Sequence, residues 1–299
     1  MKPISLILIL ILGLSISCQS PETSDSLNFI TRVDGLGRTV MIPKNPKRIL
    51  PLAPSITEML FELVPDSNIA GVTSHCNFPE DRIVKKQKIN IYPLDIESIL
   101  ALKPEIVFTE EGMIAQESLL QLKKLGIPVY VFRYANCAEV VSAMDSLSKW
   151  LPNRLEAKAK LLELHSGLEK LEKEILRSGQ NKKPSVLALT YSDPIFAYGF
   201  DTWMTDKIRL AGGINALGSK LDKPYPVLTR EAVLKLNPDV LFGGTFEKMD
   251  STFFNLYPEL RQINAWKTRR IYSLTDDLAS RPGPRLLQGI LEIKSFLEK

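Results

Sequence analysis

The apolar residues of the chain fall into two alternating patterns. Short runs rich in valine, isoleucine and leucine predict buried strands, and stretches with a helical repeat follow them. The predicted strands include residues 49–52, 69–72, 107–108, 129–132, 186–190, 240–242 and 270–274. Strands that alternate with helices predict a parallel sheet, and ligands bind at the carboxyl ends of such strands. We therefore expect the loops after these strands to carry the functional residues.

Two local signals add detail near the start of the first lobe. Residues 29–33 and 39–42 flank the turn sequence Asp34-Gly35, which predicts a β-hairpin. Ser55 and Glu58 have the spacing of a capping box, in which both side chains bond free backbone N–H groups. A helix is therefore expected to begin there.

The longest helical pattern lies in the middle of the chain. Between residues 153 and 178 there is one glycine, Gly167, and no proline, and leucine or isoleucine recurs at spacings of three and four from 161 to 175. This pattern predicts one helix of roughly 25 residues with a single apolar stripe. His165 on this helix is expected at the surface.

One stretch occurs twice at a fixed offset. Residues 97–108 and 231–242 both read as a short helix opened by a glutamate, a proline break, an acidic residue and a buried strand. Self-similarity in two copies predicts two similar lobes. The predicted fold is α/β, with two Rossmann-like lobes of parallel sheet, a ligand cleft between them and one long α-helix joining them. The lobes are expected at 29–152 and 181–299, and the helix at 153–180.

Composition and charge fit this interpretation. A chain of 299 residues favours about two domains. Its 44% apolar and 24% charged residues are typical of a globular protein. The net charge of +4 is mild, and no stripe of basic and aromatic residues indicates nucleic acid as a partner.

The first 18 residues differ from the rest. Lys2 precedes an apolar run at 4–14, and small residues and Cys18 follow, which is typical of a secretory signal peptide. A signal that ends on cysteine resembles that of bacterial lipoproteins, with Cys18 as the lipidated residue. A plain signal with a chance cysteine is the alternative. Residues 19–28 are expected to form a tether, which leaves the protein periplasmic or at the cell surface, anchored to a membrane by lipid.

Two further cysteines, Cys76 and Cys137, each follow a predicted strand of the same lobe. Export permits a disulfide between them, and separate buried thiols are an equal alternative. Neither belongs to a Cys-x-x-Cys pattern, so a zinc site has little support and no metal site is predicted.

Three segments resemble a known family. Residues 49–58 (Ile-Leu-Pro-Leu-Ala-Pro-Ser-Ile-Thr-Glu), 71–79 (Gly-Val-Thr-Ser-His-Cys-Asn-Phe-Pro) and 102–107 (Leu-Lys-Pro-Glu-Ile-Val) are similar to substrate-binding proteins of ABC importers. The class is the one with a rigid interdomain helix, which serves vitamin B12, iron-siderophores and haem. The similarity covers residues 38–298 and is strongest to the cobalamin-binding members. It implies a monomeric protein without cofactor or catalysis that delivers a corrinoid to an ABC permease dimer.

The resemblance also implies roles for two glutamates. In this family one glutamate at the top of each lobe docks onto arginine pockets of the permease, and the repeat places Glu97 and Glu231 there. A carboxylate at a helix start is favoured by the helix dipole, and two charged anchors on a rigid body fix its register on a two-fold partner. The alternative is that both glutamates only cap their helices.

The resemblance further implies a corrinoid site between the lobes. The matching positions are His75, Tyr92, Phe196, Tyr225, Asp277 and Arg281. Aromatic walls hold a large flat ligand, and a few polar groups fix its orientation. Ordinary packing is the alternative for each aromatic residue, and a local ion pair is the alternative for Asp277 and Arg281.

Other functional classes fit less well. The chain has only two histidines, His75 and His165, and no Gly-x-Ser-x-Gly, Walker or His-Glu-x-x-His motif, so a hydrolase is a remote alternative. Two histidines also argue against a zinc or manganese binder. A siderophore binder is the main rival, but it would need several cleft arginines, and Arg133 and Arg281 are the clear loop candidates. Haem is third, with His75 as its plausible axial ligand.

Overall fold

The structure is a computed structural model that describes residues 28–177, 183–218 and 223–299. The elements are β1 (Phe29–Val33), β2 (Thr39–Pro43), β3 (Ile49–Pro51), α1 (Pro54–Leu63), β4 (Val72–Thr73), α2 (Glu80–Ile83), β5 (Lys88–Ile89), α3 (Ile96–Leu102), β6 (Ile106–Glu110), α4 (Gln116–Lys124), β7 (Val129–Phe132), α5 (Cys137–Trp150), α6 (Ala157–Arg177), β8 (Ser185–Ser192), β9 (Ile195–Ala197), α7 (Trp203–Leu210), β10 (Ile214–Asn215), β11 (Val227–Leu228), α8 (Arg230–Leu236), β12 (Val240–Phe242), α9 (Phe246–Ser251), α10 (Phe253–Leu256), α11 (Asn264–Lys267), β13 (Ile271–Tyr272), α12 (Asp276–Ser280) and α13 (Leu286–Leu297).

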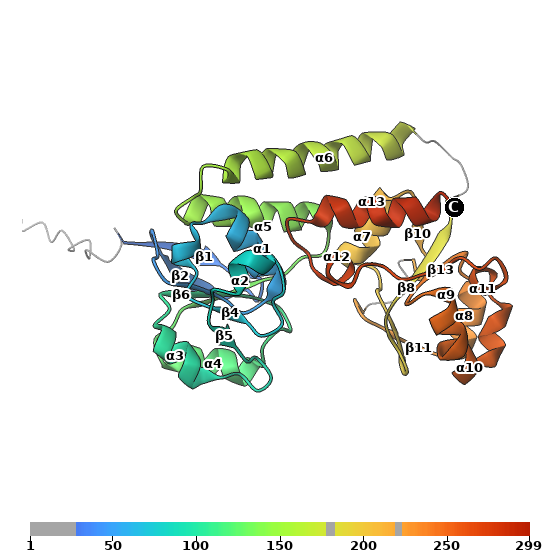
Figure 1. Cartoon of the computed structure of the whole chain (residues 1–299), viewed down its shortest axis with the longest axis horizontal. Helices are drawn as coiled ribbons and strands as arrows, with labels where there is room; N and C mark the ends of the chain where they lie inside the picture. Colours follow the sequence, from blue (N-terminus) through green and yellow to red (C-terminus); the bar gives the residue numbers. More distant parts are fainter. Residues whose placement is uncertain (1–27, 178–182, 219–222) are drawn as a thin grey trace, which may run out of the picture.

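Two α/β lobes lie side by side, and α6 runs along one side of both (Figure 1). We call β1 to α5 the N-terminal lobe and β8 to α13 the C-terminal lobe. The predicted signal segment, Cys18 and most of the tether lie outside the described residues. None of the helices in the described ranges could span a lipid bilayer.

The N-terminal lobe is built on parallel strands, as predicted. β6 lies between β3 and β7 in a parallel three-stranded sheet. An isolated parallel bridge joins Ile49 of β3 to Ile69, which lies just before the parallel pair β4–β5. Residues 106–109 of β6 are buried, because helices cover both faces of the sheet. The predicted hairpin is present as the antiparallel pair β1–β2.

The C-terminal lobe has a mixed sheet rather than a purely parallel one. β10, β8, β12 and β13 are parallel, while β9 pairs antiparallel with β8 and β11 pairs antiparallel with β9. The segment after residue 190 was expected to be a loop. It instead continues β8 to Ser192 and returns through Asp193-Pro194 as β9, and such a short connection permits only antiparallel pairing.

The repeated stretch folds the same way in both lobes. α3 is capped by Asp95, which accepts from the Ser98 N–H, and α8 is capped by Thr229, which accepts from the Ala232 N–H. Each helix ends on a left-handed residue, Lys103 (φ 46°) or Asn237 (φ 43°). A proline follows each helix and disfavours its continuation. The polypeptide therefore turns directly into a buried strand, which is β6 after α3 and β12 after α8.

The connecting helix α6 is shorter than predicted at its start. Residues 153–156 are not helical, because the Arg154 N–H donates to the Leu63 carbonyl (2.7 Å) and its side chain pairs with Asp66 (2.8 Å). α6 packs on α1 and α5 of one lobe and on α7 and α13 of the other. Gly167 permits this approach, since a Cβ there would lie 2.3 Å from Leu287 on α13.

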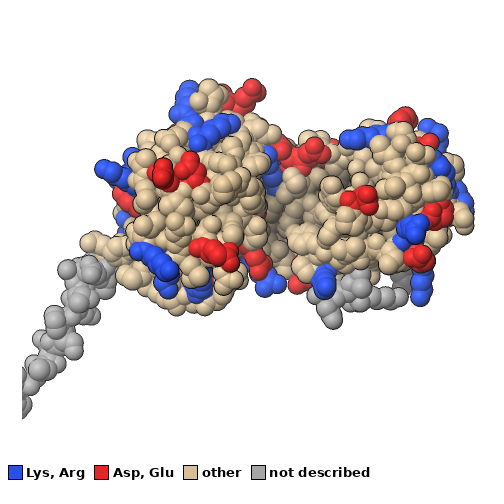
Figure 2. All heavy atoms as spheres, turned by 90° about the horizontal axis from the view of Figure 1, so that it is seen from below, with Lys and Arg blue, Asp and Glu red and all other residues tan. Residues whose placement is uncertain are grey.

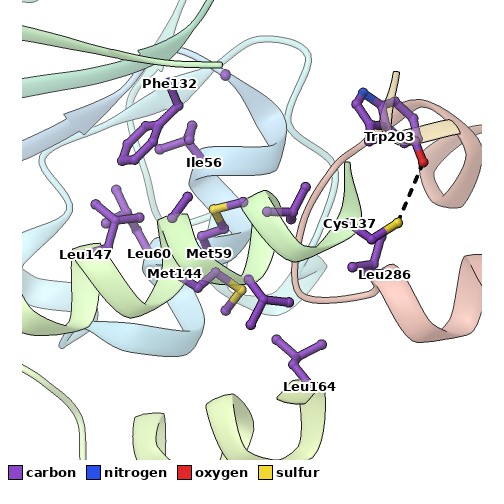
Figure 3. Close-up of a cluster of buried hydrophobic side chains, with 14 of the residues drawn as sticks. Ile56, Met59, Leu60, Phe132, Cys137, Met144, Leu147, Leu164, Trp203 and Leu286 are labelled. Carbon is purple, nitrogen blue, oxygen red and sulfur yellow. Dashed lines mark hydrogen bonds between the residues drawn. The ribbon is translucent and has the colours of Figure 1, made fainter. Parts of the chain in front are cut away.

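One hydrophobic core runs through both lobes. It joins Ile56 and Met59 on α1 to Leu164 on α6 and to Trp203 and Leu286 in the C-terminal lobe (Figure 3). The start of α5 contacts α7 directly, because the Cys137 N–H donates to Asp206 (2.9 Å). The two lobes are therefore packed as one body rather than joined by a flexible linker.

Candidate functional site

A cleft of about 770 Å³ lies between the two lobes, where the surface is visibly hollowed (Figure 2). The N-terminal lobe lines it with residues at the ends of β6 and β7: Glu110, Glu111, Gly112, Phe132, Arg133 and Tyr134. The C-terminal lobe lines it with residues 200–203, 223–225 and Pro282. In the N-terminal lobe the site thus lies at the carboxyl ends of parallel strands, as expected.

Aromatic rings form walls on both sides of the cleft. Phe132 and Tyr134 are stacked with centroids 6.0 Å apart. Across the cleft, Tyr198 makes edge contacts with Trp203 (5.7 Å) and Tyr225 (5.8 Å). Tyr225 remains 48% exposed, which leaves ring surface free to contact a ligand. Such walls suit a large flat molecule.

The cleft also contains a half-buried carboxyl and a buried phenol hydroxyl. Ser55 on α1 donates a hydrogen bond to Glu110, and burial raises the pKa of the Glu110 carboxyl to about 7. The Tyr134 hydroxyl is buried and has no hydrogen-bond partner among the described residues. Burial first, and the nearby Glu110 charge second, raise the pKa of Tyr134 well above its usual value.

The cations of the cleft are few. Arg133 pairs with Glu111 (3.3 Å), so its charge is already compensated. Lys223 is the remaining lining cation, and within the described ranges it forms no ion pair. With Glu110, Glu111 and Asp201 also present, the cleft offers no cluster of free positive charge.

The capping box predicted for Ser55 and Glu58 is wrong, although a helix does begin there. α1 starts at Pro54, and its N-cap residue Ala53 has no side-chain cap. Ser55 bonds Glu110 instead, and Glu58 is 1% exposed and bonds arginines of the other lobe. Both side chains are therefore used for contacts distant in sequence.

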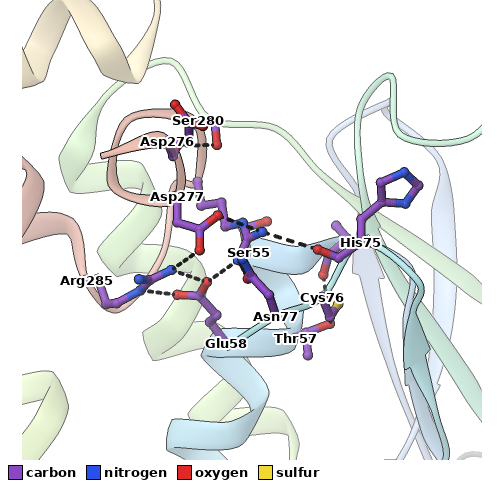
Figure 4. Close-up of polar contacts among 12 residues, drawn as sticks. Ser55, Thr57, Glu58, His75, Cys76, Asn77, Asp276, Asp277, Ser280 and Arg285 are labelled. Atoms are coloured by element: carbon purple, nitrogen blue, oxygen red, sulfur yellow. Dashed lines mark hydrogen bonds and ion pairs between the residues drawn. The ribbon is translucent and has the colours of Figure 1, made fainter. Parts of the chain in front are cut away.

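An ion cluster ties the two lobes together beside the cleft (Figure 4). Glu58 accepts from Arg285 (2.6 and 2.8 Å) and from Arg281 (3.0 Å), and Asp277 pairs with Arg281 at 2.9 Å. Arg281 also donates to Asn77 (2.5 Å) and to the His75 carbonyl (3.3 Å). The loop after β4 is thus held by the C-terminal lobe.

Of the six predicted ligand residues, Tyr225 lines the cleft and the other five do not. His75 and Tyr92 are exposed and meet edge to face at 6.0 Å, and Phe196 is half-buried in β9. Asp277 and Arg281 form the local ion pair that was the alternative. The ligand contacts of these residues stay predictions.

Several lining residues were not singled out from the sequence. Glu110 and Tyr134 follow predicted strands, so the position of a residue after a strand was a usable signal. Phe200 and Trp203 follow β9, which was expected as a loop, and no sequence signal marked them. Across the described residues, no group of three or more His, Cys, Asp or Glu is arranged to hold a metal ion.

The two cysteines are separate buried thiols, so the alternative of a disulfide is wrong. Cys76 lies between Thr73 (3.2 Å) and Thr57 (3.3 Å) under α1. Cys137 starts α5 and donates to the Trp203 carbonyl (3.6 Å). Both side chains are packed in the hydrophobic core, and each thiol has its own hydrogen-bond partners.

Glu97 and Glu231 occupy equivalent, exposed places on α3 and α8. The N-cap roles belong to Asp95 and Thr229, so neither glutamate is the cap itself. The Glu231 backbone N–H, and then the Thr229 hydroxyl, lower the pKa of the Glu231 carboxyl. Neither glutamate forms an ion pair in the part of the chain that the structure describes.

Comparison with known proteins gives a family and relatives. The family model described as "Periplasmic binding protein" matches residues 49–278. The uncharacterized ABC transporter substrate-binding lipoprotein YvrC of Bacillus subtilis is 27% identical over 88% of this chain and 84% of its own length. A vitamin B12-binding protein of Photorhabdus laumondii is 25% identical over 81% of this chain and 84% of its own length.

Solved structures share the fold. The periplasmic vitamin B12-binding protein BtuF of Vibrio cholerae matches with a TM-score of 0.73 at 21% identity, over 86% of this chain and 98% of that one. A Staphylococcus epidermidis protein described as a possible iron-binding periplasmic solute-binding protein has a TM-score of 0.72 at 26% identity, over 86% and 100%. The heme-binding protein RhuT of Roseiflexus matches at 0.66 and 23%, over 85% and 100%. The predicted two-lobed fold and the predicted family are thereby confirmed.

Proposed function

The chain belongs to the periplasmic binding protein family, and from this premise we propose that it captures cobalamin or a related corrinoid for an ABC transporter permease. It acts outside the cytoplasm, held to a membrane by lipid on Cys18. The signal pattern before Cys18 and the lipoprotein name of the Bacillus subtilis relative support the anchor. The vitamin B12-binding relatives support the ligand.

The observation that carries this proposal is the character of the cleft. A corrinoid is a large flat ring with amide side chains, so it needs aromatic walls and polar groups rather than a cluster of cations. The cleft has aromatic rings on both sides, and its arginine is paired with Glu111. It therefore suits an amide-rich ring better than an anionic chelate.

An iron chelate is the second candidate, because the Staphylococcus epidermidis protein matches at 26% identity over its whole length. An anionic siderophore would be expected to need free arginines, yet Arg133 and Arg281 are both in ion pairs. Haem fits less well, because His75, its predicted axial ligand, does not line the cleft.

The test is calorimetric titration of the protein without its signal segment with cyanocobalamin, and with ferric siderophores and haem beside it. We expect tight corrinoid binding that weakens at least about fivefold in Tyr225→Ala, because an aromatic wall is lost. Tyr191→Ala is the matched control, since Tyr191 is exposed but outside the cleft. If a ferric chelate binds and no corrinoid does, the ligand is an iron chelate rather than cobalamin.

A further inference from the structure

Two lining side chains form a polar corner of the cleft, Glu110 at the end of β6 and Tyr134 just after β7, and the buried Ser55 on α1 donates to Glu110. We propose that this polar corner binds a primary carboxamide group of the ligand. The Tyr134 hydroxyl donates to the amide carbonyl, and the Glu110 carboxylate accepts from the amide N–H. This inference rests on the proposed function, because it selects a corrinoid by its amide side chains.

Glu110 is prepared to accept one more hydrogen bond. Its Oε1 accepts from the Ser55 hydroxyl, and Oε2 has no hydrogen-bond partner in the described segments. The side chain keeps partial exposure and lines the cleft. A carboxylate is an acceptor at both oxygens, so the open oxygen requires a donor from the ligand.

Tyr134 is prepared to donate. Its hydroxyl is buried, and among the described residues nothing pairs with it, which is costly in a protein interior and leaves the O–H free to donate. The ring is held in place by stacking on Phe132, with an interplanar angle of 16°. The Glu110 charge acts on Tyr134, so the two groups lie within electrostatic reach of one another.

A primary carboxamide matches this pair because it carries an acceptor and a donor side by side. A carboxylate, as found on haem or a siderophore, has only acceptors and would meet the Glu110 charge with its own. A ligand carboxylate could therefore satisfy Tyr134 only against repulsion from Glu110. The polar corner thus discriminates between amide and acid at one position.

The other charged and titratable groups around Glu110 do not take over the proposed role of Glu110 and Tyr134 in binding a carboxamide. Glu111 is compensated by Arg133, and Tyr225 faces Glu110 from the other lobe. The titratable groups that line the cleft are Glu110, Glu111, Arg133, Tyr134, Asp201, Lys223 and Tyr225. Burial keeps the pKa of Glu110 at about 7, so its charge changes in an accessible range of pH.

The direction of the pH effect follows from the proposed hydrogen bond. An amide N–H favours the charged carboxylate, so binding releases the proton that Glu110 holds below pH 7. Cyanocobalamin affinity should be level above about pH 7 and fall by up to about tenfold per pH unit below it. The experiment is calorimetric titration from about pH 5.5 to pH 8.5, compared between wild type and Glu110→Gln.

We expect Glu110→Gln to lose this pH dependence, while Glu117→Gln, at an exposed position outside the cleft lining, keeps its midpoint. Tyr134→Phe should weaken cyanocobalamin about 2- to 12-fold at every pH, the value of one hydrogen bond. Tyr130→Phe is its matched control, because the Tyr130 hydroxyl bonds the Val33 carbonyl away from the cleft. A corrinoid whose amides are hydrolysed to carboxylates should bind wild type more weakly at pH 8, and Glu110→Gln should restore part of that loss.

Two results would overturn the inference and leave the proposed function standing. One is the same pH profile for wild type and Glu110→Gln, and the other is equal affinity of wild type for amide and hydrolysed corrinoids at pH 8. If no corrinoid binds any of the proteins, the proposed function and this inference are both overturned.

Discussion

Glu58 is almost fully buried, and both of its carboxylate oxygens accept hydrogen bonds from arginines of the other lobe. Arg281 and Arg285 are themselves only 12% and 16% exposed. A buried ion pair adds little stability over apolar packing, but removing one partner leaves the opposite charge buried without compensation. At the residue scale, the contact between the lobes therefore depends strongly on this one carboxylate.

Replacing Glu58 should have a large effect on folding. Glu58→Ala leaves two poorly solvated guanidinium groups with Asp277 as their remaining carboxylate partner in the described structure, so we expect a loss of about 3 kcal/mol in the free energy of unfolding. Glu62→Ala, one turn further along α1, is the matched control, since Glu62 forms no ion pair in the described structure. Guanidinium unfolding of both variants provides the measurement, and equal midpoints would refute the account of Glu58.

At the scale of elements, the repeated helices α3 and α8 are the clearest feature. Each has its own cap, a left-handed last residue and a glutamate exposed in its first turn. The N-caps themselves are Asp95 and Thr229, but the Glu231 backbone N–H and the Thr229 hydroxyl act on the Glu231 carboxylate, so helix capping stays the alternative role for Glu231. Docking onto a permease, which the sequence resemblance implied, is the role that we propose for them.

The docking role predicts that binding and transport can be separated. In the double variant Glu97→Ala with Glu231→Ala, ligand affinity should stay within about twofold, because neither residue lines the cleft. Corrinoid uptake through the permease should be abolished. Glu117→Ala with Glu247→Ala is the control, since these exposed glutamates occupy the first turns of α4 and α9. Normal uptake by the first variant would exclude docking through these glutamates.

For the whole molecule, continuous packing across the lobes is the main property. The core passes from α1 through α6 to Trp203 and Leu286, and the ion cluster of Glu58 adds a second connection (Figures 3 and 4). Proteins of this construction have little freedom for hinge motion, because large closure would break packed contacts. The cleft is therefore expected to be largely formed before the ligand arrives.

The sequence predicted the elements and the lobes well because periodicity and the internal repeat depend on nearby residues. The mixed C-terminal sheet and the contacts of Ser55 and Glu58 were missed. The partners of Glu58 lie 223 and 227 residues further along the chain, and no local spacing reports such a contact. The carboxyl ends of β6 and β7 line the cleft, as expected, but the sequence of the loops after them could not show that Tyr134 and Glu110 share one corner of it.

The most direct test of the proposal is the position of cobalt in crystals grown with cyanocobalamin. We predict one strong anomalous peak between the lobes, in the cleft lined by Tyr225, Trp203 and Glu110, with the lobes placed as they are without ligand. A peak outside this cleft, or crystals in which saturating cyanocobalamin leaves no cobalt bound, would contradict it.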